Sequence, residues 1–206
     1  FIVLHYNMCT HFVVTKGMKL MADTYIKYND HSISSAFKDH YIVPDYQREY
    51  VWTDEQVEQL MADLLDAYNT DNKKAYFLGT IVTYNSGSQF VLLCAIKKIY
   101  VNCGEQTSVI ENLIYSPTMN SEGDVINLYH LQLQYEDAGN CLELIEKGQE
   151  RPNYLTQSGE RLFDAFKTIQ DFLSERFPDI ASLKKFVVFL LNKTSFIRIE
   201  TYDISD

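Results

Sequence analysis

The chain has 206 residues and a formal net charge of −10, and 46% of its residues are hydrophobic and 14% aromatic. This is the composition of a folded globular protein and excludes a disordered chain. Because broad phosphate neutralisation needs a basic face, the negative charge argues against a protein that holds DNA in that way.

Residues 1–17 are apolar and aromatic, but they also include polar side chains, namely His5, Asn7, Thr10 and His11. They contain no apolar run long enough to span a membrane and no basic start of the kind that opens a signal peptide. We therefore expect no membrane association. Met18 and the residues after it resemble a natural start, so residues 1–17 are expected to be a non-native upstream extension.

The segment from Tyr41 to Trp52 is expected to be extended or turning, after a short helix over residues 32–38. Pro44 removes one backbone donor and pushes Val43 toward extended geometry, which disfavours a helix here. The backbone of this segment then displays four polar side chains, those of Asp45, Gln47, Arg48 and Glu49.

Arg48 stands beside Gln47, and this pair suits a phosphate or carboxylate ligand. The guanidinium group can make two parallel charge-assisted hydrogen bonds, and the amide can donate or accept alongside it. The alternative interpretation is that Arg48 pairs with Asp45 or Glu49 and that the aromatic side chains around it belong to the core.

A helix is predicted directly after this segment. Thr53 can cap it, and Gln56 completes a capping box three residues later. One continuous apolar face follows at helical spacing, formed by Val57, Leu60, Met61, Leu64, Leu65 and Tyr68. We interpret this face as structural.

A strand and its hairpin partner are predicted next. Residues 76–84 are rich in strand-forming side chains, and Gly79 within them suggests a bulge or a close backbone approach. Residues 85–88 are typical of a turn, so residues 89–92 are expected to return as the second strand. From Phe90 to Val101, however, the pattern passes from strand to helix with no turn residue between them.

Three motifs, at residues 44–52, 55–65 and 76–82, closely resemble the N-terminal, ParB-like domain of the GmrSD type IV restriction endonucleases. They read Pro-Asp-Tyr-Gln-Arg-Glu-Tyr-Val-Trp, Glu-Gln-Val-Glu-Gln-Leu-Met-Ala-Asp-Leu-Leu and Tyr-Phe-Leu-Gly-Thr-Ile-Val. The resemblance runs from about Met18 to the end of the chain. It implies an α+β fold, in which a ParB-like small sheet with helices is followed by a mainly helical subdomain.

The resemblance also implies a function. It implies a domain that binds and hydrolyses a nucleoside triphosphate with Mg²⁺, senses modified phage DNA and works with an HNH-type nuclease domain, on the same chain or on a separate subunit. Gln47 and Arg48 would then bind the phosphates. Supporting or stacking roles would fall to Pro44, Asp45, Tyr46, Tyr50, Trp52 and Gly79. We expect a cytoplasmic, bacterial protein of phage defence.

The second signature of the family is missing from this chain. In relatives the strand is followed by an Asp-Gly-Gln-Gln-Arg loop, which would bind the nucleotide phosphates. Here Phe90-Val91 is joined straight onto the following helix, as though a segment had been removed. Residues 103–106 do not replace the loop, because they contain Gly104 but no arginine, and we expect an ordinary loop there.

The next part of the chain is predicted to contain a loop over residues 116–123, a strand over 125–135 and a helix over 136–147 that ends at Gly148. This helix carries four carboxylates, which we interpret as a solvated surface: Glu136, Asp137, Glu143 and Glu146. No metal site is predicted, because the four cysteines and five histidines lack ligand spacing.

Residues 149–206 are expected to form the helical subdomain, after an α+β domain over residues 18–148. Ser158 can cap a long helix to Phe177, and Asp179 can cap a second helix. A final extended segment covers residues 194–202. Relatives continue into a further helix, so the chain is expected to be truncated at Asp206.

Two functions stay open from the sequence. The first is the nucleotide-binding or hydrolysing and DNA-sensing part of a modification-dependent restriction system. The second is a catalytically inactive remnant or a non-catalytic binding or regulatory module, because the phosphate-binding loop is missing. No catalytic residues are predicted, since no Ser-His-Asp or Cys-His set can be placed on a plausible site.

Overall fold

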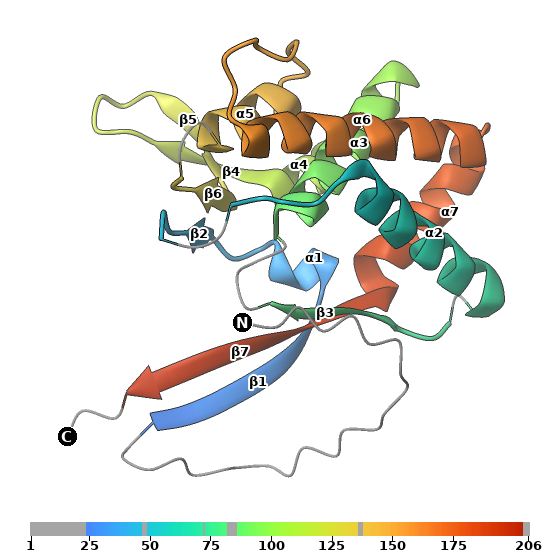
Figure 1. Cartoon of the computed structure of the whole chain (residues 1–206), viewed down its shortest axis with the longest axis horizontal. Coiled ribbons are helices and arrows are strands. Elements are labelled where there is room, and N and C mark those ends of the chain that lie inside the picture. Colours follow the sequence, from blue (N-terminus) through green and yellow to red (C-terminus); the bar gives the residue numbers. More distant parts are fainter. Residues whose placement is uncertain (1–23, 47–48, 72, 82–85, 136–137, 204–206) are drawn as a thin grey trace.

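The computed structural model describes residues 24–46, 49–71, 73–81, 86–135 and 138–203. The helices in these ranges are α1 (Ile33–Ala36), α2 (Asp54–Asp71), α3 (Ser86–Asn102), α4 (Ser108–Ile114), α5 (Ala138–Glu146), α6 (Gln157–Arg176) and α7 (Ile180–Lys193). The strands are β1 (Thr24–Ser32), β2 (Tyr41–Val43), β3 (Tyr76–Ile81), β4 (Tyr115–Met119), β5 (Val125–Tyr129), β6 (Leu131–Leu133) and β7 (Thr194–Asp203). The fold is α+β, as predicted (Figure 1).

β7 is the central strand of a three-stranded sheet with the order β1-β7-β3. It runs antiparallel to β1, starting with Thr24 opposite Asp203, and parallel to β3. The register between β3 and β7 shifts between Phe77 and Gly79, which confirms the bulge predicted at this glycine. The final extended segment predicted from the sequence is therefore an internal strand.

Two smaller sheets have two strands each. β2 and β6 are parallel, whereas β4 and β5 form an antiparallel hairpin. The single strand predicted over residues 125–135 is divided at His130, so that β5 pairs with β4 and β6 pairs with β2. The loop predicted over residues 116–123 is wrong at its start, because β4 extends to Met119 and its first residue, Tyr115, packs against Tyr129 across the hairpin.

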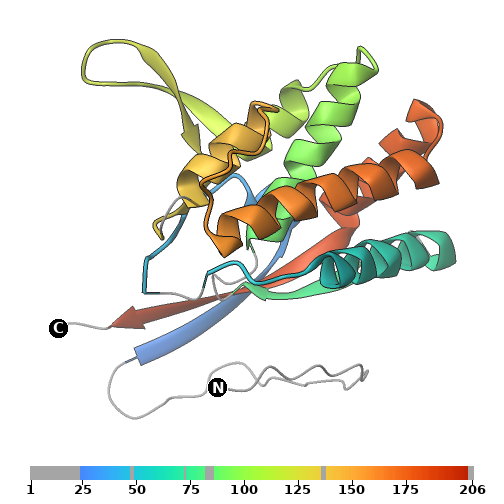
Figure 2. The ribbon, with the colours of Figure 1, turned by 45° about the horizontal axis from the view of Figure 1, so that its top comes forward.

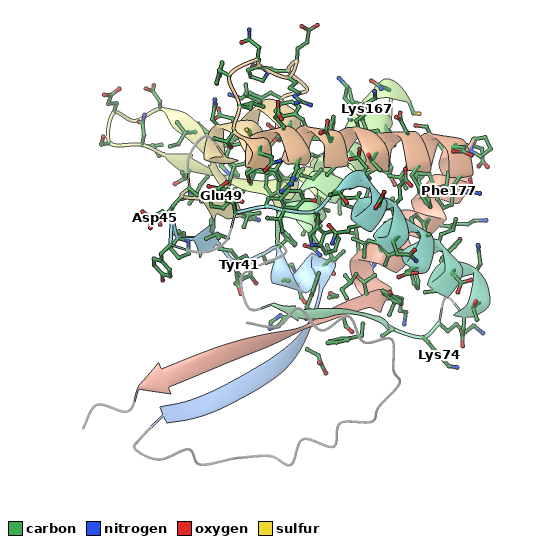
Figure 3. All side chains as sticks on the ribbon, in the orientation of Figure 1. Tyr41, Asp45, Glu49, Lys74, Lys167 and Phe177 are labelled. Carbon is green, nitrogen blue, oxygen red and sulfur yellow. The ribbon has the colours of Figure 1, made fainter. Side chains whose placement is uncertain are left out.

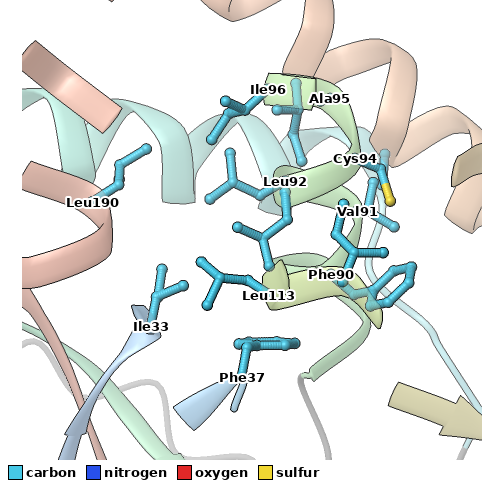
Figure 4. Packing of buried hydrophobic residues seen from close by; sticks show 14 of the residues in the cluster. Ile33, Phe37, Phe90, Val91, Leu92, Cys94, Ala95, Ile96, Leu113 and Leu190 are labelled. Carbon is cyan, nitrogen blue, oxygen red and sulfur yellow. The ribbon is translucent and has the colours of Figure 1, made fainter. Parts of the chain in front are cut away.

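The core lies around α3, which contacts α4, α5 and α6, while α2 packs on α6 and α7 (Figure 2). The predicted apolar face of α2 is confirmed, because Val57, Met61 and Leu64 are all buried. Figure 4 shows the tight packing of α3 side chains with residues of α1, α4 and α7. The seven residues from Phe90 to Ile96 are all buried.

The turn predicted at residues 85–88 is wrong over residues 86–88, and Asn85 lies outside the described residues. The hairpin partner at 89–92 and the strand-to-helix junction after Phe90 are also wrong. Ser86 to Asn102 is one helix. A helix enclosed by other helices is apolar on every side, so its sequence shows no amphipathic period and cannot be told from a buried strand by pattern. The backbone therefore needs no bend at Val91 to Leu93.

Predictions of helix ends are mostly confirmed. The side chain of Gln56 accepts a hydrogen bond from the amide of Thr53 at 3.0 Å, as in a capping box, and Asp179 caps α7. The cap of α6 is Thr156, not Ser158 as predicted. Ser158 lies inside the first turn of α6 and is buried.

The division of the chain at residue 148 stays a prediction. Elements on the two sides of it share one sheet, since β7 lies between β1 and β3. They also share one core, because α6 contacts both α2 and α3. The predicted extension over residues 1–17 lies outside the described residues.

Candidate functional site

Two parallel strands end side by side at the candidate site. Val43 is opposite Leu133 at the ends of β2 and β6, and the amide of Gln134 donates to the carbonyl of Val43 at 2.8 Å. The segment with the predicted site residues continues from the end of β2, and Tyr135 follows β6. Ligands in open sheets bind outside the carboxyl ends of parallel strands, so this edge is a natural place for a site.

Tyr50 ties the segment after β2 to the start of α3. Its side chain is buried, and its hydroxyl lies 2.9 Å from Oγ of Ser88, which is also buried, in the first turn of α3. Burial raises the pKa of Tyr50, an effect that the hydrogen bond to Ser88 partly offsets. The phenol is therefore neutral at ordinary pH and acts as a hydrogen-bonding anchor.

Gly87 lets the ring of Tyr50 approach α3 closely. A Cβ at this position would lie 3.1 Å from Cδ2 of Tyr50 and 3.5 Å from Cδ2 of Leu162 on α6. The first contact is tighter than ordinary van der Waals packing, so a side chain here would push the ring away. The absence of a side chain at Gly87 is thus part of the site's geometry.

Tyr135 extends the same cluster toward α6. It is buried, and burial raises its pKa, while the hydroxyl of Ser158 and the backbone of Tyr50 act in the opposite direction. Ser158 belongs to the first turn of α6. The segment after β2, the residue after β6 and the first turns of two helices therefore meet at one place.

This arrangement is suited to an anion. The first turn of a helix has backbone amides without partners inside the helix, and the helix dipole favours negative charge there. At this site the start of α3 contacts Tyr50 directly, and the hydroxyl of Ser158 in the first turn of α6, which is buried without a hydrogen-bond partner among the described residues, lies near Tyr135. A phosphate or carboxylate group could thus receive backbone N–H donors without a basic surface.

The predicted site residues fall into four groups. Tyr50 is buried at the site, and Trp52 and Pro44 are half-buried beside it along the chain. Asp45 is exposed (Figure 3). Tyr46 is 84% exposed. Gln47 and Arg48 lie outside the described residues. Gly79, the last of the six predicted supporting residues, is the glycine of the bulge in β3.

The sequence did not reveal Ser88, Tyr135 or Ser158 as site residues. Ser88 was hidden because residues 85–88 are typical of a turn. A signal was present nevertheless: from Ser86 the chain continues for 17 residues without proline, which is a helix length and not a strand length. Tyr135 and Ser158 carry no local signal, since only the tertiary fold brings them to Tyr50.

A comparison with family models decides the family. The model described as GmrSD restriction endonuclease, N-terminal domain, matches residues 29–206. The chain belongs to the GmrSD N-terminal family. It is therefore a component of a restriction system, and the resemblance predicted from residues 44–82 is confirmed. A search of curated proteins found no match.

This GmrSD domain also contains a buried ion pair that the sequence did not indicate. Nζ of Lys97 on α3 pairs with Glu146 on α5, whose side chain is only 5% exposed, and lies 3.5 Å from Glu111. The hydroxyl of Tyr129 donates to Glu146 at 3.0 Å. Glu146 holds the pKa of Lys97 above its ordinary value in spite of burial.

The sequence predicted that the carboxylates of the helix over residues 136–147 are solvated. This prediction is wrong for Glu146, because tertiary packing places Lys97 opposite it. The prediction holds for Glu143, which is 44% exposed and pairs with Lys147 on the same helix. Glu136 and Asp137 lie outside the described residues.

His130 forms a second buried polar centre in the domain. Its Nδ1 lies 2.5 Å from the carbonyl oxygen of Phe37 and 3.2 Å from that of Leu113, and its Nε2 lies 2.7 Å from Oγ of Ser116. Two carbonyls can only accept, so Nδ1 carries the proton and Nε2 accepts from the serine. Burial lowers the pKa of His130. The ring joins α1, α4 and β4 as a structural link.

Among the residues that the structure describes, no group of three or more His, Cys, Asp or Glu side chains could hold a metal ion. No helix in the same ranges is both long and apolar enough to cross a membrane.

Proposed function

We propose that this chain is the nucleotide-binding part of a modification-dependent restriction system, with the phosphates at the first turn of α3. The hydrogen bond between Tyr50 and Ser88 is the observation that carries the proposal. Gln47 and Arg48 precede Tyr50 by only three and two residues. The bond therefore ties the chain next to the Gln-Arg pair to a helix N-terminus, which favours phosphate.

The proposed roles follow from residue chemistry. Arg48 would bind a phosphate through its guanidinium group, and Gln47 would orient the phosphate or the sugar. The lack of a side chain at Gly87 lets the ring of Tyr50 pack against α3, which would hold the segment with Gln47 and Arg48 near the helix N-terminus. Tyr46 and Trp52 offer aromatic surface for the base, and Tyr46 is exposed as such a role requires.

The site fits the phosphates better than it fits a protein-bound metal ion. A helix N-terminus without carboxylates suits an anion, whereas Mg²⁺ in nucleotide sites is held largely by the phosphates and water, with one or two carboxylates. Exposed Asp45 and Glu49, on either side of the Gln-Arg pair, are the nearest carboxylates along the chain (Figure 3). The ion would neutralise phosphate charge when bound.

Charge bears on how DNA would be recognised. With a net charge of −10, the chain lacks the basic surface that broad DNA binding needs. We propose that modified phage DNA is contacted locally, and that cleavage belongs to an HNH-type nuclease domain on the same chain or on a partner subunit. Such a system would act in the bacterial cytoplasm.

Calorimetric titration with Mg-ATP and Mg-GTP tests the site. We expect one nucleotide to bind with micromolar affinity and Arg48→Ala to weaken binding by about tenfold or more, since a charge-assisted contact is lost. The matched control is Arg176→Ala. Arg176 lies in the last turn of α6, a helix of 20 residues that starts at the site, so its removal should leave affinity unchanged. Equal affinity of Arg48→Ala and the parent chain would remove the site assignment.

A specific observation favours a second candidate, a non-catalytic binding or regulatory module. The first turn of α3 reads Ser-Gly-Ser-Gln and has no arginine, in contrast to the Asp-Gly-Gln-Gln-Arg loop expected from the family. Loss of that arginine would remove one charge that stabilises a phosphoryl-transfer transition state. If neither nucleotide binds in the same titration, the second function is supported. If a nucleotide binds but is not hydrolysed, the second function is supported in part.

A further inference from the structure

The β4–β5 hairpin is fixed firmly at its base. The rings of Tyr115 and Tyr129 meet edge to face with centroids 5.9 Å apart. The ammonium of Lys97 lies 5.7 Å from the ring centroid of Tyr115, and Tyr129 donates to Glu146. The base of the hairpin is thereby held on α3 and α5.

Beyond this base the hairpin leaves the body of the molecule, as both ribbon views show (Figures 1 and 2). Its outer part carries apolar side chains that are exposed, with Met119 at 69%, Val125 at 71%, Ile126 at 44% and Leu128 at 36%. An isolated two-stranded ribbon is only marginally stable in water, and its open edges can pair with another chain. The anchored base keeps this ribbon formed while its edges stay open.

The register of the hairpin shows which edge can accept a strand. The amide of His130 donates to Ile114 and that of Asn120 donates to Asp124, both at 2.9 Å. Direct hydrogen bonds therefore fall on alternate pairs, and the pair of Pro117 and Asn127 between them is not hydrogen-bonded.

The position of Pro117 follows from this register. Its backbone nitrogen points away from β5, so proline removes a donor from the outer edge of β4. On the outer edge of β5 the corresponding amides belong to Val125, Asn127 and Tyr129, and none of these is a proline. In the described part of the chain β5 has no strand on that side.

The charge of the hairpin indicates the partner. Residues 115–129 contain Glu122 and Asp124 and no lysine or arginine. The tip is ordered, because Oδ1 of Asn120 accepts from the amides of Glu122 at 3.0 Å and of Asp124 at 2.8 Å. An acidic tip next to apolar strands complements a segment that combines apolar and basic side chains.

We propose that the outer edge of β5 binds an extended segment of a protein partner, in which apolar side chains alternate with lysine or arginine. The segment would add a third strand through the outward amides of Val125, Asn127 and Tyr129, the mode known as strand addition. Nucleic acid is disfavoured by the acidic tip. A second copy of this chain is disfavoured because each copy carries a net charge of −10.

The test uses a fluorescent synthetic peptide of alternating valine and lysine as the probe, measured by anisotropy. We expect saturable binding to the whole chain. Methylation of the central backbone nitrogens of the peptide keeps its charge but prevents strand pairing, and should weaken binding by about tenfold, the loss expected from one or two hydrogen bonds.

Two protein variants locate the contact. Asn127→Pro removes an outward amide of β5 without removing a hydrogen bond of the hairpin, and should weaken the peptide by a similar factor. Pro117→Ala on the other edge is its matched control; it restores a donor on β4 and should bind the peptide no more weakly than the parent does. Neutralising the tip with Glu122→Gln and Asp124→Asn should weaken binding at low salt.

Several results would overturn the proposal. The first is that the methylated peptide binds as tightly as the unmodified one, and the second is that folded Asn127→Pro binds the peptide as tightly as the parent chain. The third is that the peptide does not bind at all. The fourth is that Asn127→Pro abolishes self-association or DNA binding, and not peptide binding. Circular dichroism checks the fold of each variant. If Asn127→Pro does not fold, the methylated peptide and the neutralised tip decide the question.

Discussion

Among single residues, the fold depends on a few buried polar side chains that look like surface residues in the sequence. Lys97 and Glu146 are the strongest case, because their side chains are only 16% and 5% exposed. A charge left without its partner in such a place is much more costly than one at the surface.

We therefore predict that Glu146→Gln destabilises the protein by up to about 3–5 kcal/mol, because Lys97 loses its buried partner and keeps only the more distant carboxylate of Glu111. Chemical denaturation measures the change. The control is Glu143→Gln on the same helix, where the pair with Lys147 is about half exposed and should contribute far less to stability. Equal effects of the two substitutions would contradict the buried pair.

His130 gives the protein a pH dependence of defined sign. Burial lowers its pKa below the ordinary value, so the unfolded chain takes up a proton before the folded protein does as the pH falls. Stability contributed by neutral His130 is thus present above about pH 7 and is lost as the pH falls through about 6.5 and below.

The free energy of unfolding should therefore fall less steeply between about pH 7 and pH 5 in His130→Gln than in the parent chain. The parent chain, measured over the same pH range, serves as the reference. A parent-like slope in His130→Gln would show that this ring does not drive the dependence.

At the scale of elements, α3 is the helix on which both the core and the candidate site depend. Leu93 is 1% exposed near its middle. Leu93→Ala should cost about 2–5 kcal/mol, as expected for a buried leucine in close packing.

Val101→Ala, at a 53% exposed position of the same helix, should cost far less than Leu93→Ala. Denaturant unfolding compares the two variants. A small effect at Leu93 would show that this helix is not the centre of the core.

The elements also show what a sequence can and cannot predict. The apolar face of α2, the bulge at Gly79 and the caps at Gln56 and Asp179 were predictable, because each leaves a local pattern. α3 was misread at its start, since burial on all sides removes the helical period. The cluster of Tyr50 and Tyr135 could not be predicted, because it exists only through long-range packing.

At the scale of the whole molecule, the chain combines a GmrSD family fold with strong negative charge. The negative charge disfavours broad contact with DNA or with acidic partners, so binding should depend on local features of the surface. Two such features stand out: the meeting point of the starts of α3 and α6, and the open edge of β5. We propose a phosphate ligand for the first and a basic protein segment for the second. Either proposal can be wrong while the other is right.

Hydrogen exchange, followed by mass spectrometry with and without Mg-nucleotide, is the decisive test of the proposed phosphate site. If nucleotide binds there, exchange becomes slower in peptides that cover residues 44–52 and the first turn of α3, because phosphate would accept from those amides, and stays unchanged at the end of α6. Slower exchange elsewhere, with no change at the start of α3, would contradict the claim that nucleotide binds there.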